Sequence, residues 1–161
     1  MSPQRSEIAP ALQRLLAEES AGLGELVELL TRETHILQGE DVAAIQGIGS
    51  ERHRCVERLI RLDAERSDLC RMLSFGTGIA ALEKLVNWAD PQGQLREQWQ
   101  ANLKVARRCR EINDRNGSIV AVKLGRVQQR LAVLRGSPLP PVYGPRLLRH
   151  SALAARDLGS A

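Results

Sequence analysis

The chain has 161 residues, of which 43% are apolar, 26% are charged and only 2% are aromatic. These values are those of a folded protein and exclude a disordered chain, and the length predicts one main domain. No apolar run approaches the roughly 20 residues of a membrane span, and the polar, acid-containing N-terminus is unlike a signal peptide. Because the core must be built from Leu, Val, Ile and Ala, we expect an all-α fold.

Charge is unevenly distributed along the sequence. Residues 1–75 carry 9 basic and 13 acidic side chains, whereas residues 76–161 carry 14 basic and 6 acidic ones. This polarity suits an acidic partner, a nucleic acid, or attraction between the two halves, and does not choose among them. The three cysteines, Cys55, Cys70 and Cys109, are an odd number at helical positions, which favours reduced thiols in the cytoplasm.

The first long helix is predicted over residues 12–36, beginning near Pro10 and ending near Gly39. One row of its apolar face consists of Leu12, Leu15, Leu26, Leu29 and Ile36, with Glu19, Gly22 and Glu33 as weaker members. A second row, spaced by seven, consists of Leu16, Leu23, Leu30 and Leu37. Two adjacent rows make a wide apolar face, which predicts packing against two partners or one broad groove.

The second helix is predicted over residues 43–72, with Asp41 as its N-cap. Its buried row is spaced three and four throughout and consists of Ile45, Ile48, Arg52, Cys55, Leu59, Leu62, Arg66, Leu69 and Leu73. Arg52 and Arg66 interrupt this row. We expect their aliphatic stems to lie on the core while each guanidinium reaches water or a carboxylate.

The segment Phe75–Gly78 predicts a break between helices. Thr77, within this segment, would cap a short helix over residues 79–87. A third long helix over residues 95–133 would begin at Asp90-Pro91 and end at Gly136. Its buried row consists of Leu95, Trp99, Asn102, Ala106, Cys109, Asn113, Asn116, Val120, Val127 and Leu134. Buried asparagines require an amide or backbone group opposite, so they fix register or partner choice. The long helices are expected to form an antiparallel hairpin or bundle with coiled-coil-like packing.

The composition of the sequence changes after Gly136. This change predicts a helical domain, residues 1–136, and a flexible extension, residues 137–161. Four prolines between Pro138 and Pro145 exclude a helix and predict an extended strap. The tail beyond the strap has the pattern of a short amphipathic helix, with apolar positions Leu147, Leu148, Leu153 and Leu158.

We find no pattern that supports catalysis, a metal or another cofactor. Residues 76–81 match a dinucleotide-binding glycine pattern, but a charged helix precedes them where that pattern needs a strand. His53 and Cys55 point to different faces of a helix, and no Glu-x-x-His pair exists. The basic run from Lys104 to Arg115 lacks interleaved aromatics and reads as a solvated helix face.

Two groups of motifs together cover about residues 12–145. The C-terminal half contains Asn113-x-x-Asn116-Gly117-x-Ile119, then Val127, Leu131 and Leu134-x-Gly136, then a proline-containing strap that ends in Tyr143-Gly144. The N-terminal half contains Leu29-Leu30-x-x-Glu33, Leu37, Asp41, Ile45 and the stretch from Arg52 to Arg66. In these positions the chain resembles the FlgN family of flagellar type III export chaperones.

The resemblance implies a cytoplasmic protein that binds hook–filament junction proteins and delivers them to the export apparatus, with its binding region in the C-terminal part. The residues expected to bind the substrate protein are Val120, Leu124, Val127, Leu131, Leu134, Leu147, Leu148, Leu153 and Leu158. Tyr143 is expected either to pack the strap onto the long helix or to dock on the export gate. The sequence leaves open whether the chain forms a homodimer. The rival functions are a basic helical nucleic-acid-binding protein and a structural coiled-coil adaptor.

Overall fold

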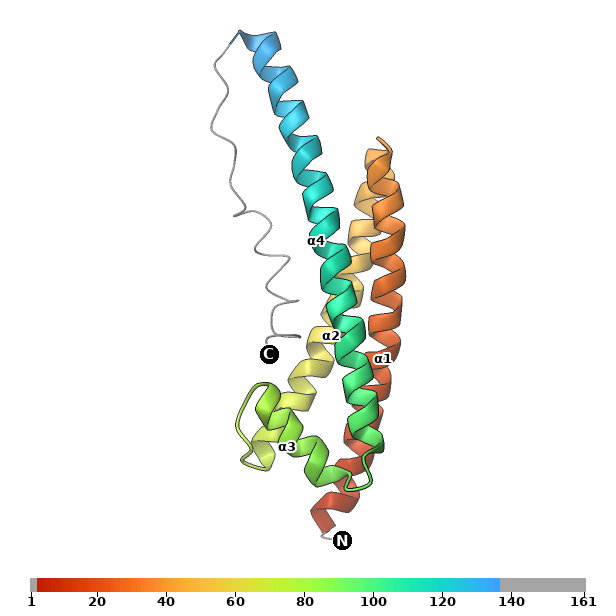
Figure 1. Cartoon of the computed structure of the whole chain (residues 1–161), viewed down its shortest axis with the longest axis vertical. Coiled ribbons are helices and arrows are strands. Elements are labelled where there is room, and N and C mark those ends of the chain that lie inside the picture. Colours follow the sequence, from red (N-terminus) through yellow and green to blue (C-terminus); the bar gives the residue numbers. More distant parts are fainter. Residues whose placement is uncertain (1–2, 137–161) are drawn as a thin grey trace.

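The computed structural model describes residues 3–136, and every regular element within them is an α-helix. The four helices are α1 (Pro3–Gln38), α2 (Val42–Met72), α3 (Ile79–Ala89) and α4 (Gln94–Arg135). Three of them are long rods that lie side by side, while α3 is short and sits at one end (Figure 1). The four helices predicted from the sequence are therefore confirmed.

Helix α1 is the centre of the bundle, because it packs along both α2 and α4. Every leucine of its two predicted apolar rows is buried, and Leu12, Leu16, Leu23 and Leu30 are fully enclosed. The expectation that this wide face serves two partners is confirmed. At Gly22, an added Cβ would lie 2.8 Å from Cδ2 of Leu59, so the missing side chain lets α2 come close.

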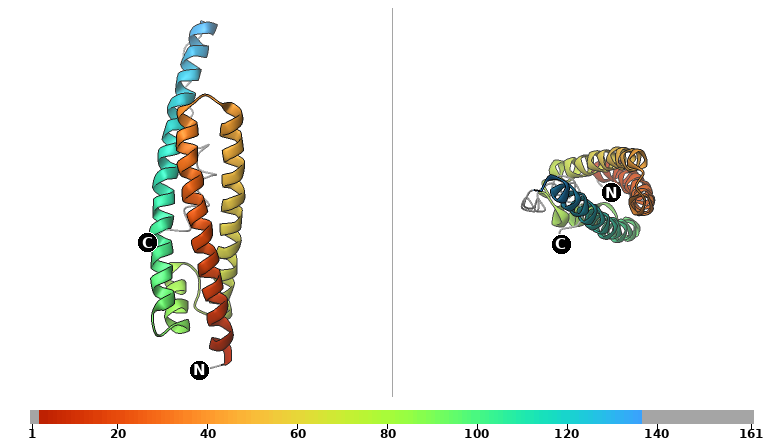
Figure 2. Two further views of the ribbon diagram at one scale, coloured as in Figure 1. Left: turned by 90° about the vertical axis from the view of Figure 1, so that its right-hand side faces the viewer. Right: turned by 90° about the horizontal axis from the view of Figure 1, so that it is seen from above.

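Helix α4 runs parallel to α1, which differs from a simple antiparallel bundle. The α1–α2 pair is the antiparallel hairpin that the sequence predicts. Helix α3 then crosses the open end of this hairpin, so α4 starts at the same end as α1 and runs in the same direction (Figures 1 and 2). The crossing is held by Leu82, Leu85 and Val86, which are buried against the N-terminal turns of α1.

Several helix boundaries differ from the predicted ones. Pro10 lies inside α1 rather than at its start, because the preceding turns continue the helix and bury Ile8 against α3. Helix α3 begins after Gly78, whose φ is 82°, and has no side-chain cap, so Thr77 is not its cap. Asp41 caps α2 as predicted, accepting a hydrogen bond from the Ala44 N–H at 3.0 Å.

The start of α4 differs from the predicted start at Asp90-Pro91, so this prediction is wrong. A turn follows Pro91, and α4 begins at Gln94 after Gly93, whose φ of 91° is left-handed. Asp90 nevertheless satisfies the first turn, because its carboxylate accepts hydrogen bonds from the backbone N–H groups of Gln92 and Leu95. Gly136, with φ 61°, ends the helix as predicted.

Candidate functional site

Past the end of the bundle, α4 carries an exposed apolar strip, so the prediction that its row stays buried at Val120, Val127 and Leu134 is wrong. We call this strip the exposed seam; it consists of Val120, Leu124, Val127, Leu131 and Leu134. Their relative exposures range from 40% for Val120 to 82% for Leu134. These positions share one side of the helix, and that side is the one that buries Leu95, Trp99 and Asn102 earlier in α4.

The seam is exposed because the helix opposite it has ended. Helix α1 stops at Gln38 and α2 starts at Val42, so the connection between them is the tip of the hairpin. The Lys123 ammonium donates a hydrogen bond to the Gly39 carbonyl oxygen at this tip. Beyond Lys123, α4 continues for about three more turns with neither α1 nor α2 beside it, roughly 18 Å at 1.5 Å per residue (Figure 1).

One flank of the exposed seam is basic. Lys123, Arg126 and Arg130 follow one another at three- and four-residue spacing along this flank, and Arg135 lies in the last turn. No acidic residue occurs between Asp114 and Arg135. The free end of α4 therefore offers an apolar strip beside a row of positive charge.

On the N-terminal side of the exposed seam, α4 is fixed to α1 by a row of side-chain donors spaced by seven residues. The Asn102 amide donates to the Leu16 carbonyl oxygen at 3.0 Å, and the Asn116 amide donates to the Leu30 carbonyl oxygen at 2.9 Å. Between them, the Cys109 thiol points at the Leu23 carbonyl oxygen at 3.8 Å. Each of the three pairs is separated by 86 positions. We call Asn102, Cys109, Asn116 and Lys123 the donor row.

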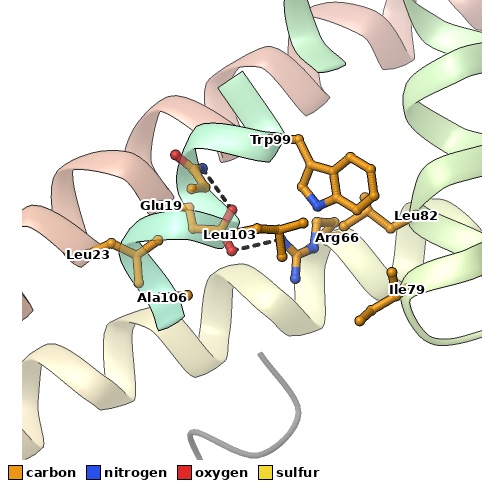
Figure 3. Close-up of a pocket in the computed structure, with 9 residues that line it drawn as sticks. Glu19, Leu23, Arg66, Ile79, Leu82, Trp99, Leu103 and Ala106 are labelled. Atoms are coloured by element: carbon orange, nitrogen blue, oxygen red, sulfur yellow. Dashed lines mark hydrogen bonds and ion pairs between the residues drawn. The ribbon is translucent and has the colours of Figure 1, made fainter. Parts of the chain in front are cut away.

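Two polar layers cross all three long helices, and each contains a glutamate from α1, an arginine from α2 and an asparagine from α4. In the lower layer, the buried Glu19 carboxylate accepts from Asn102 at 2.9 Å and from the Arg66 guanidinium at 2.7 Å. Arg66 also pairs with Asp63. Figure 3 shows Glu19 and Arg66 joined across the interior, beneath the ring of Trp99. The carboxylate is thus buried with its charge compensated.

The upper polar layer repeats the lower one two heptads later in α1 and α4, and two heptads earlier in the antiparallel α2. The buried Glu33 carboxylate accepts from Asn116 at 2.9 Å and from Arg52 at 3.3 Å. Arg52 also reaches the half-buried Asn113, and the Thr34 hydroxyl donates to the Asn116 side-chain oxygen at 2.7 Å. The expectation that Arg52 and Arg66 reach carboxylates is confirmed. The expectation that buried asparagines of α4 find a backbone group opposite is confirmed at Asn102 and Asn116.

Between the polar layers lies an apolar layer that contains two thiols. Leu23, Leu26 and Leu59 surround Cys55 and Cys109, and the Cys55 thiol donates to the Gly22 carbonyl oxygen at 3.4 Å. Burial raises the pKa of the Cys109 thiol to about 11, because the thiolate would lose its hydration there. Burial likewise raises the pKa of Cys55 and of Cys70. All three cysteines are buried free thiols.

Two cavities among the described residues are small or lined by charges that are already paired. The one in Figure 3, lined by Glu19, Arg66, Trp99 and Asn102 among others, has a volume of about 20 Å³, enough for one water molecule. A groove of about 300 Å³ lies between α2 and α3, but its charged residues, Asp63 and Arg66, are already paired with each other. Residues 3–136 hold no group of three or more metal-ligating side chains and no helix long and apolar enough to cross a membrane.

Comparison with known proteins places the chain in a family. The sequence model of the FlgN protein family matches residues 6–147. The chain belongs to the FlgN family. Proteins of this family are chaperones of flagellar export, a function that suits an all-helical body with an apolar strip exposed on α4. Searches among curated proteins and among solved structures found no match.

The asparagine motif that resembles the FlgN family lies inside the bundle. Asn116 belongs to the upper polar layer, Asn113 adjoins it through Arg52, and Gly117 follows within α4, half-buried. Asn116 bonds α4 to Leu30 and Glu33 of α1, whereas Asn113 contacts Arg52 of α2.

The remaining predicted site residues lie outside the described residues. These are Tyr143 and the tail leucines Leu147, Leu148, Leu153 and Leu158. The proline-rich strap and the flexible-extension prediction, residues 137–161, lie there too. Of the predicted binding residues, the structure therefore brings together the five of the exposed seam.

Sequence reasoning does not identify two residues that organise this site, Glu19 and Glu33. The spacing makes them only weak members of an apolar row, yet both carboxylates are buried at the centre of the polar layers. A signal is nevertheless present. Each follows a leucine of the seven-residue row by three positions, as Leu16-x-x-Glu19 and Leu30-x-x-Glu33, and the two are separated by two heptads, like Asn102 and Asn116.

Proposed function

We propose that this protein is a cytoplasmic export chaperone that binds hook–filament junction proteins and delivers them to the flagellar type III export apparatus. Membership of the FlgN family supports export chaperoning in general. The observation that supports binding of a partner protein is the exposed seam, five apolar residues on a helix whose neighbours have ended. An apolar strip of this kind marks a protein-binding surface when it is contiguous and rimmed by polar groups.

The mode of binding that suits the seam is packing of a partner helix. Apolar residues at Val120, Leu124, Val127, Leu131 and Leu134 lie at i, i+4, i+7, i+11 and i+14, the three- and four-residue spacing of helix-in-groove recognition. The junction protein would supply the second helix. Its own apolar helical segment would then be kept from water and from other copies until export.

In this proposal the C-terminal extension completes the site. Leu147, Leu148, Leu153 and Leu158 would fold over the bound helix and add a second apolar wall. Ordering a tail on binding costs about 2–5 kcal/mol of the interaction energy, which keeps the affinity in a releasable range. A chaperone needs an affinity in this range, because it must release its substrate to the export apparatus.

Removal of residues 137–161 tests the part assigned to the tail. The truncated chain is expected to keep the helical body, because the two core clusters lie entirely within residues 8–112. Its affinity for a junction protein, measured by titration calorimetry, should fall about tenfold or more. Equal affinities of the full-length and truncated chains would refute this assignment.

Tyr143 is proposed as the residue that docks on the export gate. Tyr143→Ala should then leave the melting temperature and the affinity for a junction protein unchanged, while junction-protein secretion by cells carrying the variant falls. A clearly lowered melting temperature would instead show that Tyr143 packs the strap onto the bundle.

A further inference from the structure

The seven-residue spacing of the donor row continues along the basic flank of the exposed seam, to a position beyond the end of α1. Counting on by seven from Asn102, Cys109, Asn116 and Lys123 gives Arg130. The earlier four members each reach a backbone carbonyl oxygen of α1 or of the α1–α2 connection. At the level of Arg130, α1 has already ended.

The polar layers recur every two heptads, and Arg130 is where the next one falls. Asn102 and Asn116 mark the first two layers on α4, and Arg130 follows Asn116 at the same interval. In both existing layers, α1 contributes a carboxylate three residues after a buried leucine, Leu16 with Glu19 and Leu30 with Glu33. A third layer at Arg130 would need the same contribution from another helix.

We propose that the partner is an acidic helix that packs against α4 in the way that α1 does. It occupies the place that α1 would take if it continued past Gly39, sets leucine-like residues at seven-residue spacing against Val127, Leu131 and Leu134, and gives Arg130 a carboxylate three residues after one of them. This inference rests on the proposed function and specifies the class of helix that the seam accepts.

Charge supports an acidic helix over the other occupants. Lys123, Arg126, Arg130 and Arg135 lie along the free end of α4, and no carboxylate of α4 balances them after Asp114. A second copy of this chain packed seam to seam would place these cations opposite one another, and like charges facing each other disfavour association. An apolar helix with acidic residues on its flank satisfies both the strip and its basic edge.

The guanidinium of Arg130 suits this role. Arginine binds a carboxylate through two parallel N–H···O bonds, and removing such a pair from water strengthens it. In the existing layers, Arg66 and Arg52 supply this cation from α2. At the level of Arg130, α2 is absent as well, so one arginine on α4 replaces both the asparagine and the α2 arginine.

Two synthetic helices titrated into the full chain test the proposal. Both are about three heptads long and carry leucine at seven-residue spacing; they differ only at the positions three after each leucine, which are Glu in one and Lys in the other. The Glu peptide should bind at least about tenfold more tightly than the Lys peptide, the effect of a partly buried charge pair. Equal affinities, or no binding of either peptide, would overturn the proposal.

Charge reversal on the protein identifies the residue. Arg130→Glu should remove most of the preference for the Glu peptide, because the cation that faces the added carboxylates at this level is replaced by an anion. Arg107→Glu, an exposed position on the side of α4 away from the seam, is the matched control and should leave the preference unchanged. A preference that Arg130→Glu does not move, or that Arg107→Glu moves equally, would overturn the assignment to Arg130.

A junction protein in place of the peptides separates this inference from the proposed function. Arg130→Glu should weaken its binding about tenfold relative to Arg107→Glu. A junction protein that binds all three chains equally refutes the acidic-helix inference and leaves the chaperone proposal standing. A junction protein that does not bind the unaltered chain refutes the proposed function itself.

Discussion

The side-chain amide of Asn116 donates to the backbone carbonyl oxygen of Leu30, 86 positions earlier in the chain, at 2.9 Å. Asn102 makes the same bond to Leu16 with the same separation. Because each bond joins one side chain to one backbone position, sliding α4 by a single turn along α1 would break both. The two asparagines therefore set the register of α4, and with it the length of helix that extends past the hairpin tip.

Replacing Asn116 should destabilise the fold more than replacing its neighbour in the motif. Asn116→Ala removes a donor from the buried Glu33 carboxylate and from the Leu30 carbonyl, and such losses cost about 1–3 kcal/mol in the free energy of unfolding. Asn113→Ala removes only a long contact, 3.4 Å, to Arg52 and should cost less. Urea denaturation of both variants measures the difference, and equal stabilities would show that the upper polar layer does not hold α4.

Glycines inside the helices should respond to alanine according to what lies beside them. Gly24 has nothing within 4 Å of an added Cβ, so Gly24→Ala should raise the free energy of unfolding by up to about 1 kcal/mol through helix propensity. At Gly22 the new methyl group would meet buried Leu59 at 2.8 Å, so Gly22→Ala should gain less or lose stability.

The two substitutions are compared in the same thermal denaturation experiment. They lie two residues apart in one helix, which makes each the control for the other. A larger gain from Gly22→Ala than from Gly24→Ala would contradict the close α1–α2 approach.

The Cys109 thiol should make stability depend on pH in the alkaline range. Its pKa is about 11 in the folded chain, against 9.0 for an ordinary thiol, so the unfolded state loses this proton first as pH rises. Its contribution is complete below pH 9 and is lost between about pH 9 and 11, at a slope of at most about 1.4 kcal/mol per pH unit.

Cys109→Ser isolates this contribution, because serine keeps a donor for the Leu23 carbonyl but does not titrate there. Urea denaturation across the alkaline range should show a shallower fall in stability for Cys109→Ser than for the unaltered chain. Parallel pH profiles would contradict the assignment. Iodoacetamide should also react slowly with Cys109 in the folded protein and much faster in urea.

The sequence predicts the helices well and their mutual arrangement less well. Periodicity shows which face of each helix is buried, so the seven-residue row of Leu16 to Leu37 and the asparagines of α4 are found from the sequence alone. Periodicity does not show which helix each buried face packs against. The parallel pairing of α1 with α4 depends on bonds between residues 86 positions apart and on the path of α3, neither of which leaves a local pattern.

The candidate site shows the same division. The apolar spacing of Val120 to Leu134 is visible in the sequence, and it looks the same as the buried spacing that precedes it. Only the position of the hairpin tip beside Lys123 shows where burial ends and the exposed seam begins. The importance of Glu19 and Glu33 is hidden for a related reason, because a buried carboxylate is recognisable only when its donors on other helices are known.

The measurement that tests the central claim most directly compares two aspartate substitutions on opposite sides of the same turn of α4. Leu131 lies on the exposed seam, whereas Val133 is an apolar residue on the other side of the helix, and both are exposed. Titration calorimetry with a junction protein should show at least about a tenfold loss of affinity for Leu131→Asp and little change for Val133→Asp. Circular dichroism should show both variants folded. Equal affinities of the two variants would contradict the claim that the exposed seam of α4 binds the substrate.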